Sequence, residues 1–380
     1  MRILHTADLH LGRQFNGISL DEDHQAALDQ IEAAVRQYAV DVLVIAGDIF
    51  DRAAPPASAI RQFNNFLTRI ASETEAAVVM MAGNHDSGDR IGSMAVMTDR
   101  RRALIRGTVA ADEPPLILSD EHGRVAFSAL PFCYEYAARE CFSDESLASP
   151  EDVLRAQIAA ARRHVPDGTR WVIAAHAFVA GGEGSESERP LVRVGGIETV
   201  RPDVFAGADY VALGHLHRPQ AVGGAHIRYC GSPLAFGFDE ANAEKSICLV
   251  EMDGGGKVRV EAIPIVARRG VRVLTGRHSE LLQAEPSEDF VKAILTDEVP
   301  VIDAMKRLRA VFPNACELTY AARERAPETK GLQTRLARLA DPVSVAKDFV
   351  AFVEEAPMGE SEESVVAAAL DALVRHEDAA

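Results

Sequence analysis

Five short apolar runs in this chain each end in residues that can bind a metal ion. Runs of this length, bounded by glycine and polar residues, are typical of buried strands. We therefore expect five strands, each followed at its end by polar side chains. The runs are ILHTADLH (3–10), VLVIAGDIFD (42–51), VVMMAGNHD (78–86), WVIAAH (171–176) and YVALGHLH (210–217).

The N-terminal part of the chain alternates between strand and helix. Strand candidates lie at 2–6, 41–46 and 77–82, and helix candidates lie between them at 21–38 and 56–72. Alternation of this kind is typical of βαβ units, which form a largely parallel sheet.

A second group of strands is predicted further along the chain. Residues 116–132 read as a hairpin, and a helix near 150–164 precedes the strand that ends at His176. From residue 209 the pattern is strand-rich, and we expect these strands to form a sheet that packs against the first one. The predicted fold class is α/β, a four-layer α/β sandwich with a small α/β capping domain and C-terminal helices.

The chain of 380 residues is long enough for two or three domains. The periodic core pattern ends near the ARRG sequence, so we predict a main domain over 1–268. Residues 269–325 then form a small capping domain with a strand, a helix (301–312) and a strand, which we expect to rest on the main domain. Residues 326–380 carry two amphipathic helical segments, which either cover the core or dock onto a partner.

Cysteine usage and hydropathy limit the class of protein. Five cysteines lie far apart without a CxxC pair, which argues against a disulfide scaffold and favours a reducing cytoplasm. The N-terminus lacks a signal-peptide pattern, and no apolar stretch approaches the roughly 20 residues of a membrane helix. We therefore expect a soluble, cytoplasmic protein.

The net charge of −17 argues mildly against a free-standing nucleic-acid binder, because phosphate contacts need local Lys and Arg residues. Two alternatives stay open. A partner could supply the positive surface, or a local basic patch could form from Arg90, Arg100, Arg101, Arg102 and Arg106.

The side chains at the strand ends offer oxygen and nitrogen donors and no thiolate. Such a mixed set suits Mn²⁺, Fe²⁺, Zn²⁺ or Co²⁺ rather than a soft-metal site. Two ions about 3.5 to 4 Å apart can clamp a phosphoryl group and activate water for attack at phosphorus. The pattern therefore predicts a two-metal hydrolytic site built from seven residues, Asp8, His10, Asp48, Asn84, His176, His215 and His217.

These residues have different expected roles. Asp48 lies in a tight GDIFD turn and can offer two oxygens, so it is the candidate bridge between the ions. Asp8 and His10 should point to the same side if the chain stays extended past the strand. His85, beside Asn84, need not be a ligand and is free to act on the substrate as a charge stabiliser or an acid.

Other polar residues lie close to the predicted site. Asp51 and Asp86 are near assigned site residues and could orient an imidazole or anchor a turn. His5, inside the first strand, is expected to pack in the core, with a contact beneath the site as the alternative. The remaining histidines are expected to be solvated: His24, His122, His164, His226, His278 and His376.

The motifs DLH, GDIFD, GNHD, a lone His and GHLH, in this order, resemble the calcineurin-like metallophosphoesterase superfamily. The sequences ILHTADLHLGRQF, VIAGDIFDRAAPP, MAGNHDS, YVALGHLHRPQ and RYCGSPLAFGFDE are more similar to its DNA repair exonuclease branch. The likeness covers about the first 265 residues and, more loosely, the unit after them. The segment AGGEGSESERP (180–190) departs from the family, is acidic and is interpreted as flexible.

The resemblance implies a division of labour among the site residues. His85 becomes the catalytic histidine. It also implies Mn²⁺ as the cofactor, with 3′ to 5′ exonuclease activity and endonuclease activity on DNA hairpins and ends. The implied assembly is a homodimer with an ATPase of the SMC type, which the C-terminal segment would bind. Carried onto this chain, one ion takes Asp8, His10, Asp48 and His217, and the other takes Asp48, Asn84, His176 and His215.

Two other functions are compatible with the motifs. The motifs alone do not fix the substrate, so the first alternative is a phosphoesterase that acts on a small substrate such as a cyclic nucleotide, or on a phosphoprotein. The second is a non-catalytic scaffold that keeps the fold and binds the ATPase, against which every ligand position is filled. RYCGSPLAFGFDE and the capping domain favour the nuclease.

Overall fold

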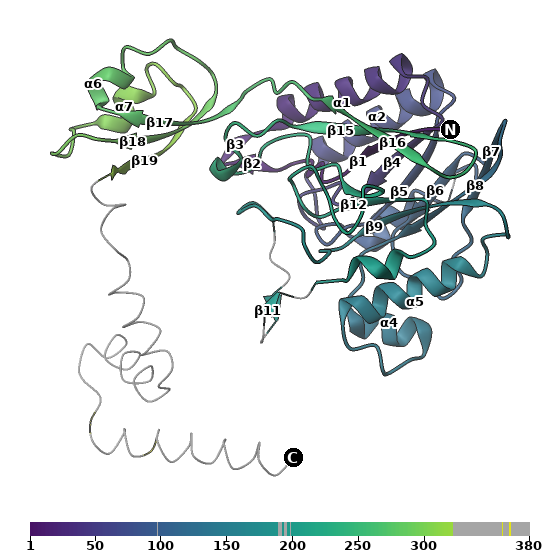
Figure 1. Ribbon diagram of the computed structural model, residues 1–380. Coiled ribbons are helices and arrows are strands. Elements are labelled where there is room, and N and C mark those ends of the chain that lie inside the picture. The colour runs from purple at the N-terminus through teal and green to yellow at the C-terminus, as the bar shows by residue number, and fades with distance from the viewer. Residues whose placement is uncertain are drawn as a thin grey trace. The chain divides into compact units, whose positions relative to one another are not determined.

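The computed structural model describes residues 1–96, 98–188, 192–193, 196–197, 199–321, 359 and 365. Two six-stranded sheets stack on each other, helices cover their outer faces, and a three-stranded sheet follows along the chain (Figure 1). The chain divides into two compact units, Met1–Ala293 with Val301–Leu318 and Ile294–Pro300 with Thr319–Ala380. The mixed α/β class predicted from the sequence is confirmed.

The first sheet consists, in this order, of β16 (Val258–Pro264), β15 (Ser246–Met252), β1 (Arg2–Thr6), β4 (Val42–Ala46), β5 (Ala77–Met81) and β6 (Ala103–Arg106). Strands β1, β4, β5 and β6 run parallel. Strand β15 is antiparallel to β1, and β16 is antiparallel to β15. The predicted parallel strands at the N-terminus are confirmed.

Helices α1 (Asp21–Gln37) and α2 (Ala57–Glu73) connect the first three parallel strands and cover one face of this sheet (Figure 1). In α2, Phe63, Phe66 and Ile70 recur at helical spacing and are buried in the core. Burial of each such side chain contributes roughly 1.5 to 3 kcal/mol to folding. Both helices were predicted within a residue of their observed bounds.

The second sheet consists, in this order, of β13 (Gln220–Ala221), β14 (Ile227–Tyr229), β12 (Tyr210–Gly214), β9 (Arg170–His176), β8 (Gly123–Leu130) and β7 (Leu116–Asp120). Strands β14, β12, β9 and β8 run parallel, with antiparallel β13 and β7 at the edges. Helix α5 (Pro150–Arg162) lies on its outer face beside α4 (Glu135–Phe142) (Figure 1). The hairpin and the helix predicted in this part are confirmed.

Three apolar clusters separate the layers. The first lies between α1, α2 and the first sheet and contains Leu28 and Phe63. The second, with Val44 and Val172, lies between the two sheets, and the third, with Ile158, lies between the second sheet and α5. A strand buried on both faces is apolar throughout, which is why the sequence shows continuous apolar runs. The predicted four-layer sandwich is confirmed.

The strands after residue 209 divide between the two sheets. Strands β12, β13 and β14 join the second sheet, whereas β15 returns to the first and pairs with β1. Strand β15 is apolar on both faces, with Ile247 and Leu249 in the first cluster and Cys248 and Val250 in the second. Such a strand needs a sheet that is covered on both sides. The expectation of a single second sheet is therefore wrong for residues 246–264.

Several short elements were not predicted. Elements of two to six residues carry too little periodicity to be read from sequence. They are β2 (Gln14–Phe15), β3 (Ile18–Ser19), α3 (Gly88–Ser93), β10 (Val192–Arg193), β11 (Gly196–Ile197), η1 (Pro202–Phe205) and η2 (Phe238–Glu240).

The capping domain contains a three-stranded sheet in the order β17 (Val271–Gly276), β18 (Phe290–Leu295) and β19 (Ala315–Tyr320), with helices α6 (His278–Leu281) and α7 (Ala304–Leu308). Strand β17 was not predicted, and the predicted helix 301–312 is reduced to α7. Phe290 stacks on Phe15 of the main domain with ring centroids 4.6 Å apart, and Arg269 pairs with buried Asp23. These contacts agree with the expectation that the cap rests on the main domain.

The predicted C-terminal helices lie outside the described residues, apart from positions 359 and 365. His376 lies outside them as well. Among the described residues, no helix is both long and apolar enough to cross a membrane.

His5 joins the two sheets through hydrogen bonds. Its Nδ1 lies 3.0 Å from the Tyr210 hydroxyl, and its Nε2 lies 3.2 Å from the carbonyl oxygen of Leu213. Because a carbonyl oxygen only accepts, Nε2 donates to Leu213 and Nδ1 accepts from the tyrosine. The neutral ring is therefore fully bonded in the core, which matches the expected packing role.

Two histidines that were expected to be solvated are buried. His24 is 1% exposed and His278 is 3% exposed. His24 lies on the inner side of α1, with its ring centroid 6.2 Å from that of Phe236. The expectation was wrong because position on a helix does not by itself show which face a residue occupies.

We expect the free energy of unfolding to fall as the pH drops from about 7 to about 5.5. Burial lowers the pKa of His5 to about 3 and that of His24 to about 4. Below the unfolded pKa of about 6.5, the unfolded chain binds protons that the folded chain does not, and each group then removes up to about 1.4 kcal/mol per pH unit. Urea unfolding at both pH values measures this loss.

His5→Gln removes one of these two groups, so the variant should lose about 1 kcal/mol less than the wild type over the same interval. His122→Gln, in the exposed turn between β7 and β8, is the matched control and should leave the loss unchanged. An identical pH dependence in His5→Gln and the wild type would contradict the assignment of a neutral, buried His5.

Candidate metal centre

The carboxyl ends of parallel strands from both sheets meet at one edge of the sandwich. Two hydrogen bonds join the edges there. His176 Nδ1, at the end of β9, lies 2.9 Å from the carbonyl oxygen of Ala46, at the end of β4. The N–H group of His215, after β12, donates to Asp8, after β1, at 2.9 Å. The structure thereby brings the predicted donors from five separate strands into one cluster.

Asp8 and His10 reach the cluster through a turn and not through extended backbone. Strand β1 ends at Thr6, and the φ angles of Asp8 and His10 are 52° and 45°, a left-handed conformation that is rare outside glycine. Their N–H groups donate to the carbonyl oxygens of Gly47 and Asp48 at 3.1 and 3.0 Å. The expectation of an extended segment is therefore wrong, although both side chains still enter the cluster. Strain of this kind concentrates at functional sites.

Asp48 lies at the centre of the cluster. Its Oδ1 accepts from the N–H group of His85 at 2.8 Å. Its Oδ2 lies 3.4 Å from His176 Nε2 and 3.7 Å from His10 Nε2. Gly47 before it has a φ of 86°, and a Cβ at that position would lie 2.4 Å from the His176 ring, so the turn requires glycine. The Asp48 carboxylate therefore faces residues of both predicted ligand sets.

Asn84, His176 and His215 form one side of the cluster. Asn84 Oδ1 lies 2.9 Å from His176 Nε2 and 3.1 Å from His215 Nδ1. His176 donates its Nδ1 proton to the carbonyl of Ala46, which leaves its Nε2 lone pair directed at Asn84 and Asp48. Because that hydrogen bond is to the main chain, the orientation of the His176 ring does not depend on a neighbouring side chain.

Asp8, His10 and His217 form the other side of the cluster, and their donor atoms all lie within 4.8 Å of one another. The Nε2 atoms of His10 and His217 are 3.1 Å apart, and both rings are buried. Two unprotonated ring nitrogens at this distance repel each other unless a proton or a cation lies between them.

His85 lies beside both sets. Its Nδ1 is 2.8 Å from the carbonyl oxygen of Asp51 and donates to it. Its Nε2 consequently faces the cluster, 4.0 Å from Asp48 Oδ2. The ring packs edge-on against His10 with centroids 4.7 Å apart. This arrangement fixes the ring and leaves one nitrogen directed toward the position where a substrate would bind.

Asp51 and Asp86 hold the loops that carry the donors. Asp51 orients His85 through its carbonyl oxygen, and its carboxylate lies 3.7 Å from His10 Nδ1. The Asp86 carboxylate accepts from three backbone N–H groups in the loops after β4 and β5, at distances of 2.9 to 3.0 Å, from Ile49, Phe50 and Gly83. These contacts agree with the expected roles of orienting an imidazole and anchoring a turn.

The electrostatics of the cluster favour a bound cation. Burial raises the pKa of Asp8 well above its ordinary value. Burial would also raise the pKa of Asp48, but the imidazoles around it, His176 foremost, hold that pKa below its usual range. Burial lowers the pKa of His176, yet the charge of Asp48 outweighs this effect and raises the pKa to about 9. Buried carboxylates that draw a proton onto a neighbouring imidazole offer the same place to a divalent ion.

The sequence did not indicate the residues that lie behind His217. Ser187 contacts the ring of His217, and Glu240 and Lys245 lie behind Ser187. Glu240 ends the RYCGSPLAFGFDE motif, which was the available signal, but nothing in that motif pairs it with Ser187. The described part of the segment 180–190 is hydrogen-bonded through Glu183, Ser185, Ser187 and Glu188, so its interpretation as flexible is wrong there.

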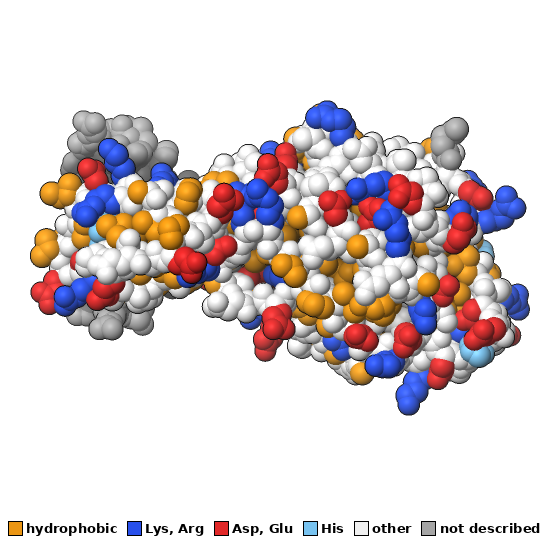
Figure 2. All heavy atoms as spheres, turned by 90° about the horizontal axis from the view of Figure 1, so that it is seen from above, with side chains coloured by type: hydrophobic (Ala, Val, Ile, Leu, Met, Phe, Trp, Pro, Cys, Tyr) orange, Lys and Arg blue, Asp and Glu red, His pale blue; other side chains and the backbone are white. Residues whose placement is uncertain are grey.

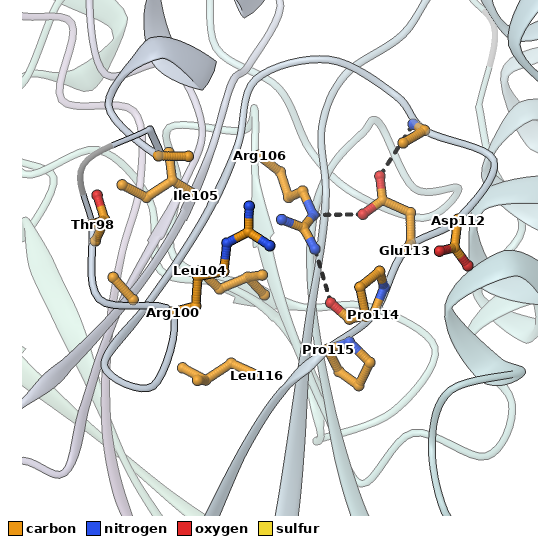
Figure 3. A pocket seen from close by; sticks show the side chains of 13 residues that line it. Thr98, Arg100, Leu104, Ile105, Arg106, Asp112, Glu113, Pro114, Pro115 and Leu116 are labelled. Atoms are coloured by element: carbon orange, nitrogen blue, oxygen red, sulfur yellow. Dashed lines mark hydrogen bonds and ion pairs between the residues drawn. The ribbon is translucent and has the colours of Figure 1, made fainter.

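A cavity of about 450 Å³ lies beside β6, and none of the predicted site residues lines it. Figure 3 shows that Arg106 turns toward Glu113 and Pro114 in this cavity. Its Nε donates to Glu113 at 2.5 Å, and its Nη2 donates to the carbonyl of Pro114 at 2.8 Å. The Arg106 charge is therefore already paired and is not free for a phosphate.

The local basic patch considered above is largely neutralised. Arg101 pairs with Asp99 at 3.3 Å, and Arg102 lies 3.8 Å from Glu75. On the face drawn in Figure 2, Lys and Arg side chains are interspersed with Asp and Glu side chains and do not gather into one positive area. These pairs weaken the patch as a site for a phosphate backbone and favour the alternative that a partner supplies positive charge.

Comparison with known proteins gives the class. Residues 1–219 match the calcineurin-like phosphoesterase family, and residues 268–354 match a family described as type 5 capsule protein repressor C-terminal domain. Because the first match spans more than half of the chain, this protein belongs to the calcineurin-like phosphoesterase family. The resemblance seen in the motifs is confirmed, and membership of this family implies the use of divalent metal ions.

Two curated relatives are named as the SbcD subunit of the nuclease SbcCD. The protein of Staphylococcus saprophyticus is 31% identical over 323 residues, which cover 84% of this chain and 84% of the relative. The protein of Staphylococcus epidermidis is 28% identical over 323 residues, which cover 84% of this chain and 85% of the relative. The predicted similarity to a DNA repair nuclease branch is thereby confirmed.

Proposed function

We propose that this chain is the nuclease subunit of an SbcCD-type complex, a two-metal phosphodiesterase that cuts DNA. It acts as a 3′ to 5′ exonuclease and as an endonuclease on hairpins and ends, in DNA repair, recombination and replication. Its relatives are named as nuclease subunits, which supports the class of substrate. The observation that carries the chemistry is the convergence of carboxylate, amide and imidazole donors around the Asp48 carboxylate.

The donor set fits two Mn²⁺ ions, because each side of Asp48 offers mixed oxygen and nitrogen atoms and no sulfur. The ions, when bound, neutralise the charge of a phosphoryl group and activate water for in-line attack. One ion would be held by Asp8, His10, Asp48 and His217, and the other by Asp48, Asn84, His176 and His215.

His85 acts on the leaving group in this proposal. Its Nδ1–H bond to the Asp51 carbonyl prevents the ring from rotating, so Nε2 stays directed into the cluster. In its protonated form the ring donates from Nε2 to the leaving oxygen and stabilises the charge that develops there. Asp86 keeps this geometry by tying the His85 loop to the Asp48 loop through three backbone N–H groups.

The proposed partner is SbcC, the SMC-like ATPase, which together with a homodimer of this chain would make a heterotetramer. The relatives are named as one subunit of SbcCD, which supports a second kind of subunit. The net charge of −17 supports a partner that contributes positive surface to DNA binding. We assign the docking of the ATPase to the C-terminal segment 326–380, and the contact with DNA ends to the capping domain 269–325.

We expect the purified chain, alone or with its ATPase, to degrade a duplex with 3′ ends in Mn²⁺ and to lose this activity in EDTA. A phosphodiester model substrate, bis(p-nitrophenyl) phosphate, is assayed in parallel, because the cluster by itself hydrolyses any phosphodiester that reaches it. Gel electrophoresis of labelled DNA and release of p-nitrophenol provide the two readouts.

Each alternative function has its own outcome in this assay. Hydrolysis of the small ester with no cleavage of DNA, with and without the ATPase, would show a small-substrate phosphoesterase and overturn the nuclease proposal. Binding of the ATPase with neither activity would show a scaffold.

A further inference from the structure

A line of polar contacts runs behind the ring of His217. His217 Nδ1 lies 2.6 Å from Ser187 Oγ, and Ser187 Oγ lies 2.7 Å from Glu240 Oε1. Lys245 Nζ contacts the other carboxylate oxygen of Glu240. Glu240 is 1% exposed and Lys245 is 6% exposed. A buried ion pair contributes little net stability compared with apolar side chains, so its presence here calls for another explanation.

The direction of each hydrogen bond follows from counting protons. The Lys245 ammonium has three, which point to Glu240, to Ser232 Oγ at 3.0 Å and to the carbonyl oxygen of His217 at 3.0 Å. Glu240, as the carboxylate partner of that ammonium, only accepts, so the Ser187 hydroxyl donates its proton to Glu240. The Ser187 oxygen is then left as the acceptor for His217. His217 must therefore carry its proton on Nδ1.

This tautomer determines what His217 presents to the cluster. With the proton on Nδ1, the Nε2 atom has a free lone pair, and it lies 3.1 Å from His10 Nε2 and in one group with Asp8. A ligating imidazole generally donates its other N–H to an acceptor that fixes both the tautomer and the ring orientation. Ser187 occupies that acceptor position.

The main chain of His217 is held on both sides by the same network. Its N–H group donates to Glu188 Oε1 at 2.7 Å, and its carbonyl oxygen accepts from Lys245. Arg13 in turn fixes Ser187, because its Nη2 donates to the Ser187 carbonyl oxygen at 2.9 Å. Three elements distant in sequence thus converge on one histidine.

We propose that Ser187 is a positioning residue for metal binding: backed by Glu240 and Lys245, it holds His217 with Nε2 directed at the ion shared with Asp8 and His10. The role extends to the acidic segment that carries Ser187, since Glu188 fixes the backbone of the same histidine. The proposal rests on the proposed function, because it takes His217 as a metal ligand.

The test compares Ser187→Ala, Ser187→Thr and Ser185→Ala in the full-length chain, stripped of metal and titrated with Mn²⁺. Free Mn²⁺ is followed by electron paramagnetic resonance. Ser187→Ala should weaken one of two Mn²⁺ sites by about 10 to 100-fold and lower kcat for DNA cleavage more than it changes KM. Ser187→Thr keeps the hydroxyl and should restore affinity to within about threefold of the wild type.

Ser185→Ala is the matched control. Ser185 lies in the same segment and its side chain contacts Ser187 Oγ at 2.9 Å, one step further from the His217 ring. It should bind both ions with wild-type affinity. Because Ser187 is only half-buried, Ser187→Ala should keep the thermal midpoint of the wild type, which separates positioning from folding.

Two results would overturn the proposal. One is a Ser187→Ala protein that binds both ions as tightly as the wild type. The other is an equal loss of affinity in Ser187→Thr. His217→Ala distinguishes this failure from a failure of the proposed function. If His217→Ala loses one ion and Ser187→Ala does not, only the role of Ser187 is wrong, whereas a His217→Ala protein that still binds two ions refutes the ligand assignment itself.

Discussion

Asp48→Asn should lower the rate of DNA cleavage in Mn²⁺ by about a thousandfold or more, since bound metal ions contribute several kcal/mol to the stabilisation of the transition state. The Asp48 carboxylate faces both sides of the cluster, so its loss weakens both ions at once. Asparagine keeps an oxygen for the N–H group of His85 and tolerates the φ of 47° at this position. The protein should therefore stay folded while Mn²⁺ titration shows the loss of both sites.

Asp89→Asn is the control for the charge change, because Asp89 is an exposed carboxylate on α3. It should leave both cleavage and Mn²⁺ binding at the level of the wild type. Asp48→Asn with cleavage within about tenfold of the wild type would mean that the carboxylate does not bridge two ions.

His85→Ala should reduce kcat for DNA cleavage by about 100 to 10,000-fold, the range expected when a general acid or charge stabiliser is removed. Mn²⁺ binding should remain, because His85 already uses its Nδ1 proton on the Asp51 carbonyl and stands beside both ligand sets. Steady-state cleavage kinetics together with Mn²⁺ titration of the same preparation measure both quantities. The separation of catalysis from metal binding distinguishes His85 from every residue of the proposed ligand set.

His122→Ala, in the exposed turn after β7, is the matched histidine control and should cleave DNA normally. Loss of one ion in His85→Ala would make His85 a ligand. Unchanged cleavage with both ions bound would remove it from the chemistry altogether.

The strands and the donors at their ends were predictable because their signals are local. An apolar run of five residues followed by Gly-Asp or Gly-Asn specifies both a buried strand and a turn, as at β4 and β5. Parallel strands then bring their carboxyl ends to one edge without further information. The donors after β9 and β12 reached the same place for the same reason, through the second sheet.

The long-range contacts were not predictable, because they join residues far apart in the chain. Ser187 and Glu240 are separated by 53 positions, and only the return of β15 to the first sheet places Lys245 behind them. A serine in an acidic segment carries no periodic signal that would pair it with a glutamate in another motif.

Local backbone geometry escaped prediction for a different reason. Asp8 and His10 adopt left-handed conformations because their N–H groups bond to the carbonyls of the loop after β4. That loop is more than thirty residues away in the sequence, so the turn is set by tertiary structure. Both side chains nevertheless reach the site, since the turn redirects the chain toward Asp48.

The presence of two metal ions on either side of Asp48 is the central claim, and anomalous diffraction from a crystal of the full-length protein grown with Mn²⁺ tests it most directly. The account predicts two anomalous peaks about 3.5 to 4 Å apart, both within coordination distance of the Asp48 carboxylate. His217 and His10 would contact one peak, and Asn84 and His176 the other. A single peak, or peaks that Asp48 does not touch, would contradict it.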